Sequence, residues 1–206
     1  MAKLVEISEV KLLLEEAEIL LSAIKDSGQK TEIETGELLK QIEEPFALFV
    51  AGEFNSGKSS FINYLAGKVV APVGVLPTTS AVMPLEAGKF VLIDSPGTNS
   101  ILAGHQEVTE QFIKRADAVL FVTSVERPLS ESESEFLKFI SSKWKREIVF
   151  VINKSDLRTN EENMTIKEFV ESSLAKIINF RPIIFSVSTK TGDGIDALVK
   201  HLEDYF

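Results

Sequence analysis

The chain has 206 residues, of which 44% are hydrophobic, and its formal net charge at pH 7 is −9. This size suits one sizeable domain with a small appendage. The acidic balance argues against a nucleic-acid partner bound through a broad basic face, because neutralising phosphates requires clustered Lys and Arg. The absence of cysteine excludes a disulfide framework, thiol catalysis and Cys-ligated zinc. No apolar stretch approaches the ~20 residues needed to span a bilayer, and we expect this portion of the protein to be soluble.

An amphipathic helix is expected near the N-terminus, over about residues 4–25. After a break at 26–30, a short helix over 34–43 should end before Pro45. The first helix has a broad apolar face and is expected to belong to a helical bundle, the alternative being that it folds back onto its own domain. Steps of three and four residues define this face, which contains Val10, Leu13, Ala17, Leu20 and Ile24.

The main domain is organised around a complete GxxxxGKS motif at residues 52–59, here called the phosphate loop. It lies between an apolar run over 46–51 and a helix-like segment that starts at Ser60. Strand, glycine loop and helix occur in the required order, because loop N–H groups must face the phosphates while the helix N-terminus supplies partial positive charge. Lys58 should reach the β- and γ-phosphates and Ser59 should bind Mg²⁺. The expected nucleotide contacts here are Gly52, Asn55, Ser56, Gly57, Lys58, Ser59 and Ser60, and Asn55, Ser56 and Lys58 are also expected to be catalytic.

Further apolar runs predict the strands of a mostly parallel sheet. They occur at residues 90–93, 118–122, 148–152 and 182–185, and a shorter strand is expected near 80–86. The runs are continuous rather than alternating, which is typical of strands that are covered on both faces. We therefore predict an α/β fold of the P-loop NTPase type, with helices on both sides of the central sheet.

Capping boxes predict where two of these helices begin. Ser130 with Glu133 should start a helix whose apolar residues share one face. Thr159 with Glu162 repeats the same signal, and a last helix is expected over 195–206.

Two stretches carry oxygen ligands and backbone donors for the phosphates. Asp94 closes an expected strand, where its carboxylate would hold Mg²⁺ through water, and the N–H of Gly97 would meet the γ-phosphate. In the loop after the first helix, Thr78 or Thr79 would supply a hydroxyl, with Thr79 ranked first. The expected metal ligands are therefore Ser59, Thr79 and Asp94, and Thr79 is also expected to be catalytic.

The segment with Asn153, Lys154 and Asp156 is expected to select guanine. An Asp carboxylate there would accept both hydrogens from the N1 and N2 edge of guanine. Adenine lacks the 2-amino group and would leave the carboxylate unpaired in a buried slot. These residues predict GTP binding and hydrolysis. The other side of the base should be covered by Ser188, Thr189 and Lys190.

The hydrolysis step has two unusual features. Thr98 stands where Ras-like proteins use a Gln to orient the attacking water, so intrinsic hydrolysis should be slow or should depend on another group. The phosphate loop contains no Arg, and Asn55 occupies the position at which cation-dependent GTPases carry an Asn that helps to hold K⁺. We hypothesise that Asn55 binds K⁺ when two such domains meet across their nucleotides. The alternative is an Asn that bonds a neighbouring loop.

Several segments carry a family resemblance. Residues 44–60 and 75–79 resemble the bacterial dynamin-like and mitofusin-related GTPases. Residues 94–99, 115–117 and 126–133 are similar to the FZO-like proteins of chloroplasts and their cyanobacterial relatives. The resemblance extends over about residues 44–190.

The resemblance implies a membrane-remodelling GTPase that acts in fusion or fission and forms a homodimer through its GTPase domains. It implies two parts, an N-terminal helical segment (1–43) within a neck bundle and a dynamin-type GTPase domain (44–206). The parent protein would act on the cytoplasmic or stromal side of a bacterial inner membrane or of a chloroplast thylakoid or envelope membrane. This chain shows no long stalk or membrane-inserting segment, so we interpret it as a GTPase domain cut from something larger, with lipid contact made elsewhere.

Two other functions fit part of the sequence. One is a small regulatory GTPase of the Era or TrmE kind, which acts in RNA or ribosome metabolism and shares the phosphate-loop Asn. Those proteins normally add an RNA-binding domain or a basic face, and this sequence shows neither. The other is a scaffold that binds GTP without hydrolysing it, against which the intact Lys58, Ser59 and Asp94 argue.

Overall fold

The computed structural model describes residues 12, 13, 16, 17, 19, 46–53, 55–69, 83–87, 90–94, 113, 114, 116–144, 146 and 148–205. The chain divides into two units, Met1–Pro45 and Phe46–Phe206. In the first unit the five described residues are helical. The remainder of the two expected N-terminal helices lies outside the described residues.

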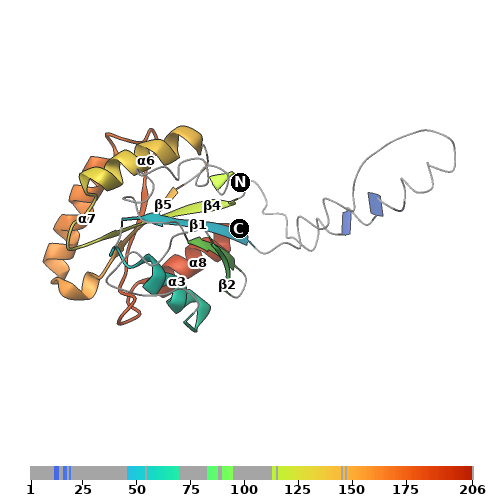
Figure 1. Ribbon diagram of the computed structural model, residues 1–206, viewed down its shortest axis with the longest axis horizontal. Coiled ribbons are helices and arrows are strands. Elements are labelled where there is room, and N and C mark those ends of the chain that lie inside the picture. The colour runs from blue at the N-terminus through green and yellow to red at the C-terminus, as the bar shows by residue number, and fades with distance from the viewer. Residues whose placement is uncertain are drawn as a thin grey trace. The chain divides into compact units, whose positions relative to one another are not determined.

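The second unit is built on one six-stranded sheet (Figure 1). Neighbouring strands are parallel except for β2 and β3, which are antiparallel, so the prediction of a mostly parallel sheet is confirmed. The strands run outward in both directions from β1, and a wound sheet of this kind leaves a crevice at the carboxyl ends of its strands. In order across the sheet they are β2 (Met83–Ala87), β3 (Phe90–Asp94), β1 (Phe46–Gly52), β4 (Ala118–Ser124), β5 (Ile148–Asn153) and β6 (Ile183–Ser186).

Helices cover both faces of the sheet, as the continuous apolar strands predicted (Figure 1). The helices are α3 (Lys58–Ala66), α6 (Glu131–Lys143), α7 (Asn160–Leu174) and α8 (Ile195–Tyr205), with a 3₁₀ turn at Ser155–Leu157. Alternate residues of β1 point to opposite sides. Phe49 packs in the cluster with α6 and α7, whereas Val50 packs in the cluster with α3 and α8. Among the described residues, none of the helices has the length and the apolar character that crossing a membrane demands.

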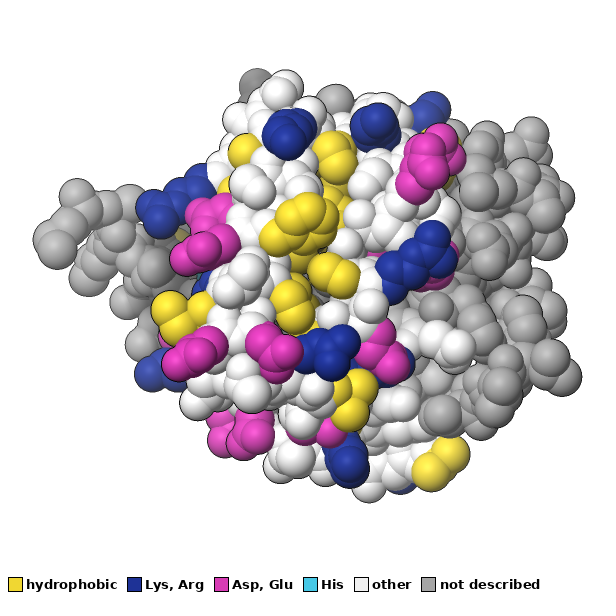
Figure 2. Space-filling model, turned by 90° about the vertical axis from the view of Figure 1, so that its left-hand side faces the viewer, with side chains coloured by type: hydrophobic (Ala, Val, Ile, Leu, Met, Phe, Trp, Pro, Cys, Tyr) yellow, Lys and Arg dark blue, Asp and Glu magenta, His cyan; other side chains and the backbone are white. Residues whose placement is uncertain are grey.

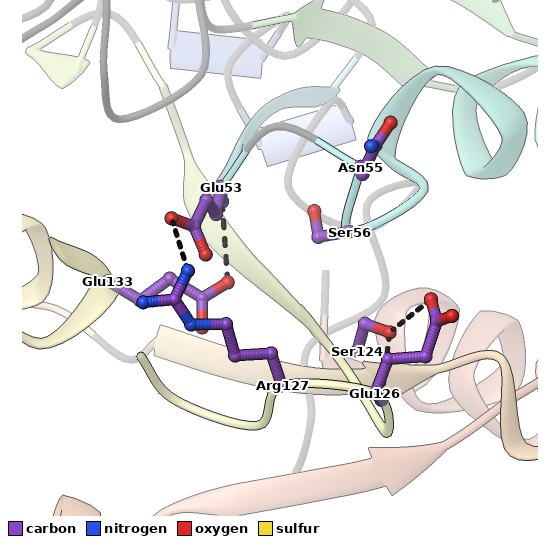
Figure 3. Close-up of a pocket in the computed structure, with 7 residues that line it drawn as sticks. All are labelled: Glu53, Asn55, Ser56, Ser124, Glu126, Arg127 and Glu133. Atoms are coloured by element: carbon purple, nitrogen blue, oxygen red, sulfur yellow. Dashed lines mark hydrogen bonds and ion pairs between the residues drawn. The ribbon is translucent and has the colours of Figure 1, made fainter. Parts of the chain in front are cut away.

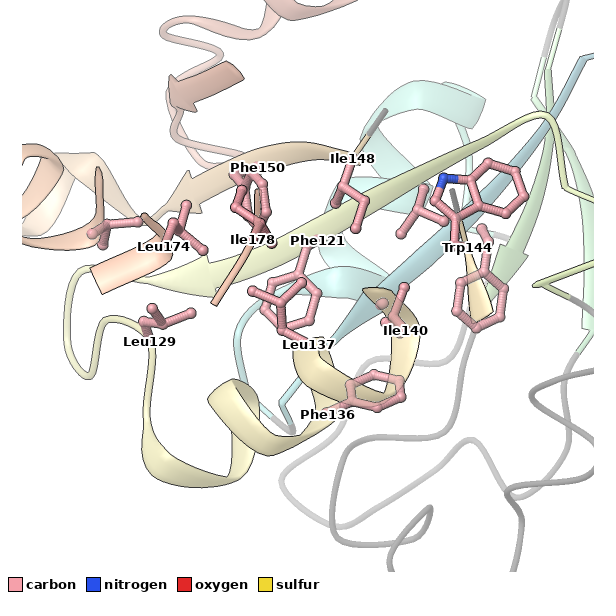
Figure 4. Close-up of a cluster of buried hydrophobic side chains, with 14 of the residues drawn as sticks. Phe121, Leu129, Phe136, Leu137, Ile140, Trp144, Ile148, Phe150, Leu174 and Ile178 are labelled. Carbon is pink, nitrogen blue, oxygen red and sulfur yellow. The ribbon is translucent and has the colours of Figure 1, made fainter. Parts of the chain in front are cut away.

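The larger core cluster fixes α6 against β4 and β5 (Figure 4). The rings of Phe121 and Phe136 have centroids 6.1 Å apart, and those of Phe121 and Phe150 are 6.0 Å apart. Ile140 of α6 and Trp144, the residue that follows the helix, are also buried. Burying such large side chains contributes about 1.5–3 kcal/mol each, so α6 is held firmly against β4 and β5.

Both predicted capping boxes are present. Ser130 Oγ accepts from the Glu133 N–H at 3.2 Å, and the Glu133 carboxylate accepts from the Ser130 N–H at 3.0 Å. At α7, Thr159 and Glu162 make the equivalent pair of bonds at 3.3 and 2.8 Å. Each box satisfies backbone donors that a helix start leaves free.

Candidate nucleotide-binding site

The phosphate loop connects β1 directly to α3 and turns through residues with positive φ. These are Gly52 (145°), Asn55 (66°) and Gly57 (92°). A Cβ on Gly52 would lie 2.1 Å from the carbonyl oxygen of Val122, and a Cβ on Gly57 would lie 2.2 Å from Nδ2 of Asn153. Both glycines are therefore required by close approach as well as by backbone conformation.

Lys58, the first residue of α3, is buried and bonds back to the start of the loop. Its Nζ donates to the carbonyl oxygens of Gly52 at 3.1 Å and Glu53 at 2.9 Å. The ammonium is thus held inside the turn whose N–H groups are expected to receive phosphates. Within the described part of the chain, Ser56 Oγ is buried and has no hydrogen-bond partner.

Asn153 ends β5 and joins three segments of the expected site. Its Nδ2 donates to the Ser56 carbonyl at 3.1 Å, and its Oδ1 accepts from the N–H groups of Lys154 at 2.7 Å and Thr189 at 3.3 Å. The side chain is completely buried. The structure therefore brings the phosphate loop, the 153–156 segment and the 188–190 segment together, as the sequence predicted.

Asp156 is oriented by the segment that follows β6. Ser188 Oγ donates to Asp156 Oδ1 at 2.7 Å, and Lys190 Nζ lies 3.8 Å from Asp156 Oδ2. Ser188 Oγ in turn accepts from the N–H groups of Lys190 at 3.2 Å and Thr191 at 3.1 Å. A carboxylate fixed in this way has one defined direction in which to accept hydrogen bonds from a base edge.

Lys154 adopts a left-handed conformation with φ 64°. Its ammonium pairs with the carboxylate of Glu126, in the connection between β4 and α6. The hydrogen bond from Lys154 and its positive charge lower the pKa of Glu126. Sequence reasoning gave Glu126 no such role.

The metal ligands are placed only in part. Ser59 is the second residue of α3, and Asp94 ends β3, where its backbone pairs with Val50 of β1. Serine and aspartate supply the hard oxygen donors that Mg²⁺ prefers, and these two residues come from the start of α3 and the end of β3. Thr79 and Gly97 lie outside the described residues.

A cavity of about 410 Å³ opens at the phosphate loop (Figure 3) and is lined by Glu53, Asn55, Ser56, Ser124, Glu126, Arg127 and Glu133. The sequence predicted Asn55 and Ser56 as site residues and missed the other five. Burial raises the pKa of Glu133 to about 7. A signal for the buried carboxyl was present, because Glu133 precedes Phe136 and Leu137 by three and four residues and so shares their apolar face.

Comparison with known proteins gives sequence relatives among several kinds of GTPase. The chain is 37% identical over 185 residues to the probable transmembrane GTPase FZO-like, chloroplastic, of Arabidopsis thaliana, covering 75% of this chain and 20% of the relative. It is 33% identical over 175 residues to the tRNA modification GTPase MnmE of Borreliella burgdorferi, covering 81% of this chain and 36% of that protein. The chain thus spans well under half the length of either relative. The expected resemblance to FZO-like GTPases is confirmed.

The fold and the family agree with these relatives. The bacterial dynamin GTPase LeoA from ETEC superimposes with a TM-score of 0.63 at 19% identity, over 97% of this chain and 41% of LeoA, which shows a common fold. A family model described as 50S ribosome-binding GTPase matches residues 47–154. Because that match includes more than half of the 206 residues, the chain belongs to this GTPase family.

Proposed function

We propose that this chain is the GTP-binding and GTP-hydrolysing domain of a dynamin-like membrane-remodelling protein. The observation that carries the nucleotide assignment is Asn153, whose side chain joins the phosphate loop to the segments that orient Asp156. One site can therefore hold the phosphates and accept the guanine edge at the same time. Similarity to the FZO-like GTPase supports the membrane role.

The residues of the site divide the work of phosphoryl transfer. Lys58 would leave the loop carbonyls to which it bonds and donate to the β- and γ-phosphates. Ser59 and Asp94, with Thr79, would hold Mg²⁺, and the Gly97 N–H would meet the γ-phosphate. When bound, Mg²⁺ neutralises charge on the β- and γ-phosphate oxygens.

Lys58→Ala tests this assignment, with Lys68→Ala as a matched control because Lys68 is exposed just beyond α3. GDP and GTP affinities by calorimetry and single-turnover hydrolysis should both fall for Lys58→Ala and stay unchanged for Lys68→Ala, since only the first removes a phosphate-binding charge. Tight GTP binding by the wild-type chain without any turnover would instead identify a GTP-dependent scaffold.

We propose further that Asn55 binds K⁺ in a dimer formed across the nucleotides. Asn55 has a left-handed backbone conformation and is exposed, although it also lines the cavity, so a second domain could approach it. GTP turnover should be faster in K⁺ than in Na⁺ and should rise more than proportionally with protein concentration. Rates that respond to neither variable would contradict this proposal.

The N-terminal segment, residues 1–43, is proposed to form part of a neck bundle that carries closure of the GTPase dimer to a membrane. The parent protein would then act at a chloroplast or bacterial membrane through regions beyond this chain. Co-sedimentation of the full-length parent with liposomes should depend on GTP if this is correct.

The second candidate function is regulation in RNA metabolism, which the similarity to the tRNA modification GTPase favours. On the face shown in Figure 2, Lys and Arg are interspersed with Asp and Glu among the described residues, rather than gathered into one basic region. RNA binding usually needs such a region. Retention of RNA by the full-length protein, without liposome binding, would favour this second function.

A further inference from the structure

The segment 126–133 contributes to the family resemblance and has no part in the proposed function beyond the start of α6. The structure places its last residues against the phosphate loop. Ser132 Oγ donates to Glu53 Oε1 at 2.7 Å, and Ser130 Oγ donates to Glu53 Oε2 at 3.0 Å. Glu53 directly follows Gly52, so its carboxylate links the first turn of the loop to the first turn of α6.

The backbone of Glu53 is held as well. Its N–H donates to Glu133 Oε1 at 3.4 Å, and its carbonyl accepts from Lys58 Nζ at 2.9 Å. Glu133 is itself fixed, because its Oε2 accepts from Thr123 Oγ1 at 2.8 Å and from the Ser130 N–H at 3.0 Å. Every polar group of Glu53 therefore has a partner, and the hydrogen-bond partners of its N–H and carboxylate belong to the start of α6.

Charge alone would disfavour a carboxylate at this point. The negative charge of Glu53 would repel the phosphates of a nucleotide bound in the adjacent loop. Such repulsion is strongest where water is scarce, and the Glu53 side chain is only 15% exposed. Arg127, 4.0 Å from Glu53 Oε1, is 73% exposed and offsets this charge only weakly. Figure 3 shows the Glu53 side chain on the side of the loop that faces Glu133 and Arg127, away from Asn55.

We propose that Glu53 is a positioning residue for the β-phosphate of the bound nucleotide. Ser130 and Ser132 hold its carboxylate, and this attachment sets the first turn of the phosphate loop in the geometry that receives phosphate. The inference rests on the proposed nucleotide function and adds α6 as the element that positions the loop.

Repulsion and positioning predict opposite results for Glu53→Ala. If Glu53 acted only through its charge, its removal would tighten GDP binding. If it positions the loop, GDP affinity should fall about tenfold, the effect of losing roughly one hydrogen-bonded charged group. GMP lacks the β-phosphate, so its affinity should fall by less than about twofold, and Glu53→Gln, which keeps an acceptor oxygen, should recover part of the loss.

Ser132→Ala tests the partner side without altering the cap residue Ser130. It should weaken GDP binding about threefold, and Glu53→Ala with Ser132→Ala should lose no more than Glu53→Ala alone, because both changes break one link. Ser134→Ala is the matched control, since that hydroxyl lies on the same helix and contacts the Leu129 carbonyl instead. If Glu53→Ala does not fold, Ser132→Ala decides the question by itself. Its affinity should then fall more for GDP than for GMP.

Tighter or unchanged GDP binding by Glu53→Ala, equal losses for GDP and GMP, or additive losses in the double variant would each overturn this inference. Absence of GDP binding by the wild-type chain would instead overturn the proposed function. Isothermal titration calorimetry with GDP and GMP, alongside thermal unfolding of each nucleotide-free variant, separates these results.

Discussion

Replacing Asn153 with Ala should both destabilise the domain and weaken nucleotide binding. The side chain makes three hydrogen bonds, of 2.7, 3.1 and 3.3 Å, and is completely buried. Each backbone group left without its partner costs about 1–3 kcal/mol, and the long bond to Thr189 should cost least. We therefore expect the free energy of unfolding to fall by about 5 kcal/mol, counting the two shorter bonds at a middle value and the third at the lower limit.

The stability loss can be measured by urea unfolding of the nucleotide-free chain, monitored by circular dichroism. The change in nucleotide affinity can be measured by titration with GDP. Asn179→Ala is the control, because Asn179 is exposed. The GDP affinity of Asn153→Ala should fall, since the phosphate loop and the 188–190 segment lose their common anchor. A loss of stability below about 1 kcal/mol, the least expected for one buried unsatisfied group, would refute the reasoning.

Three further predictions concern single positions. Gly57→Ala should cost more stability than Gly67→Ala, because both have positive φ but only Gly57 faces an atom at 2.2 Å, whereas nothing lies within 4 Å of a Cβ on Gly67; equal losses by thermal unfolding would contradict the close approach. Glu133 should make stability fall with rising pH between 4.5 and about 7, because the folded carboxyl stays protonated while the unfolded one ionises. In urea titrations, Glu133→Gln should abolish this decline of about 3 kcal/mol in the free energy of unfolding, whereas the control Glu135→Gln should keep it. A decline in Glu133→Gln as large as the one in Glu135→Gln would contradict the prediction. Asp156→Asn should reduce the preference for GDP over ADP in calorimetry, and undiminished discrimination would contradict the base assignment.

The parts of the site that follow from local rules could be predicted from the sequence. The phosphate loop needs glycines at a fixed spacing between a strand and a helix, and both capping boxes pair residues three positions apart. Parallel strands place their carboxyl ends together, so Asn153 and the 188–190 segment could be expected near the loop. The structure confirms this convergence.

The rest depends on contacts between distant residues. Ser132 and Glu53 are 79 positions apart, and Lys154 and Glu126 are 28 positions apart. No periodicity links such pairs, because their approach depends on how α6 packs against β4 and on the strand order. The sequence likewise predicted a mostly parallel sheet without indicating that β1 would stand between β3 and β4.

The place of β1 inside the sheet has a consequence for hydrogen–deuterium exchange. Residues 48–50 pair with β3 on one side and with β4 on the other, so their amides can exchange only when the whole domain opens. Exchange at these amides would report global stability, whereas exchange in the β4–α6 connection would report local opening. When a ligand binds, slower exchange at residues 48–50 would measure stabilisation of the whole domain. Any additional slowing in the β4–α6 connection would measure ordering of that loop.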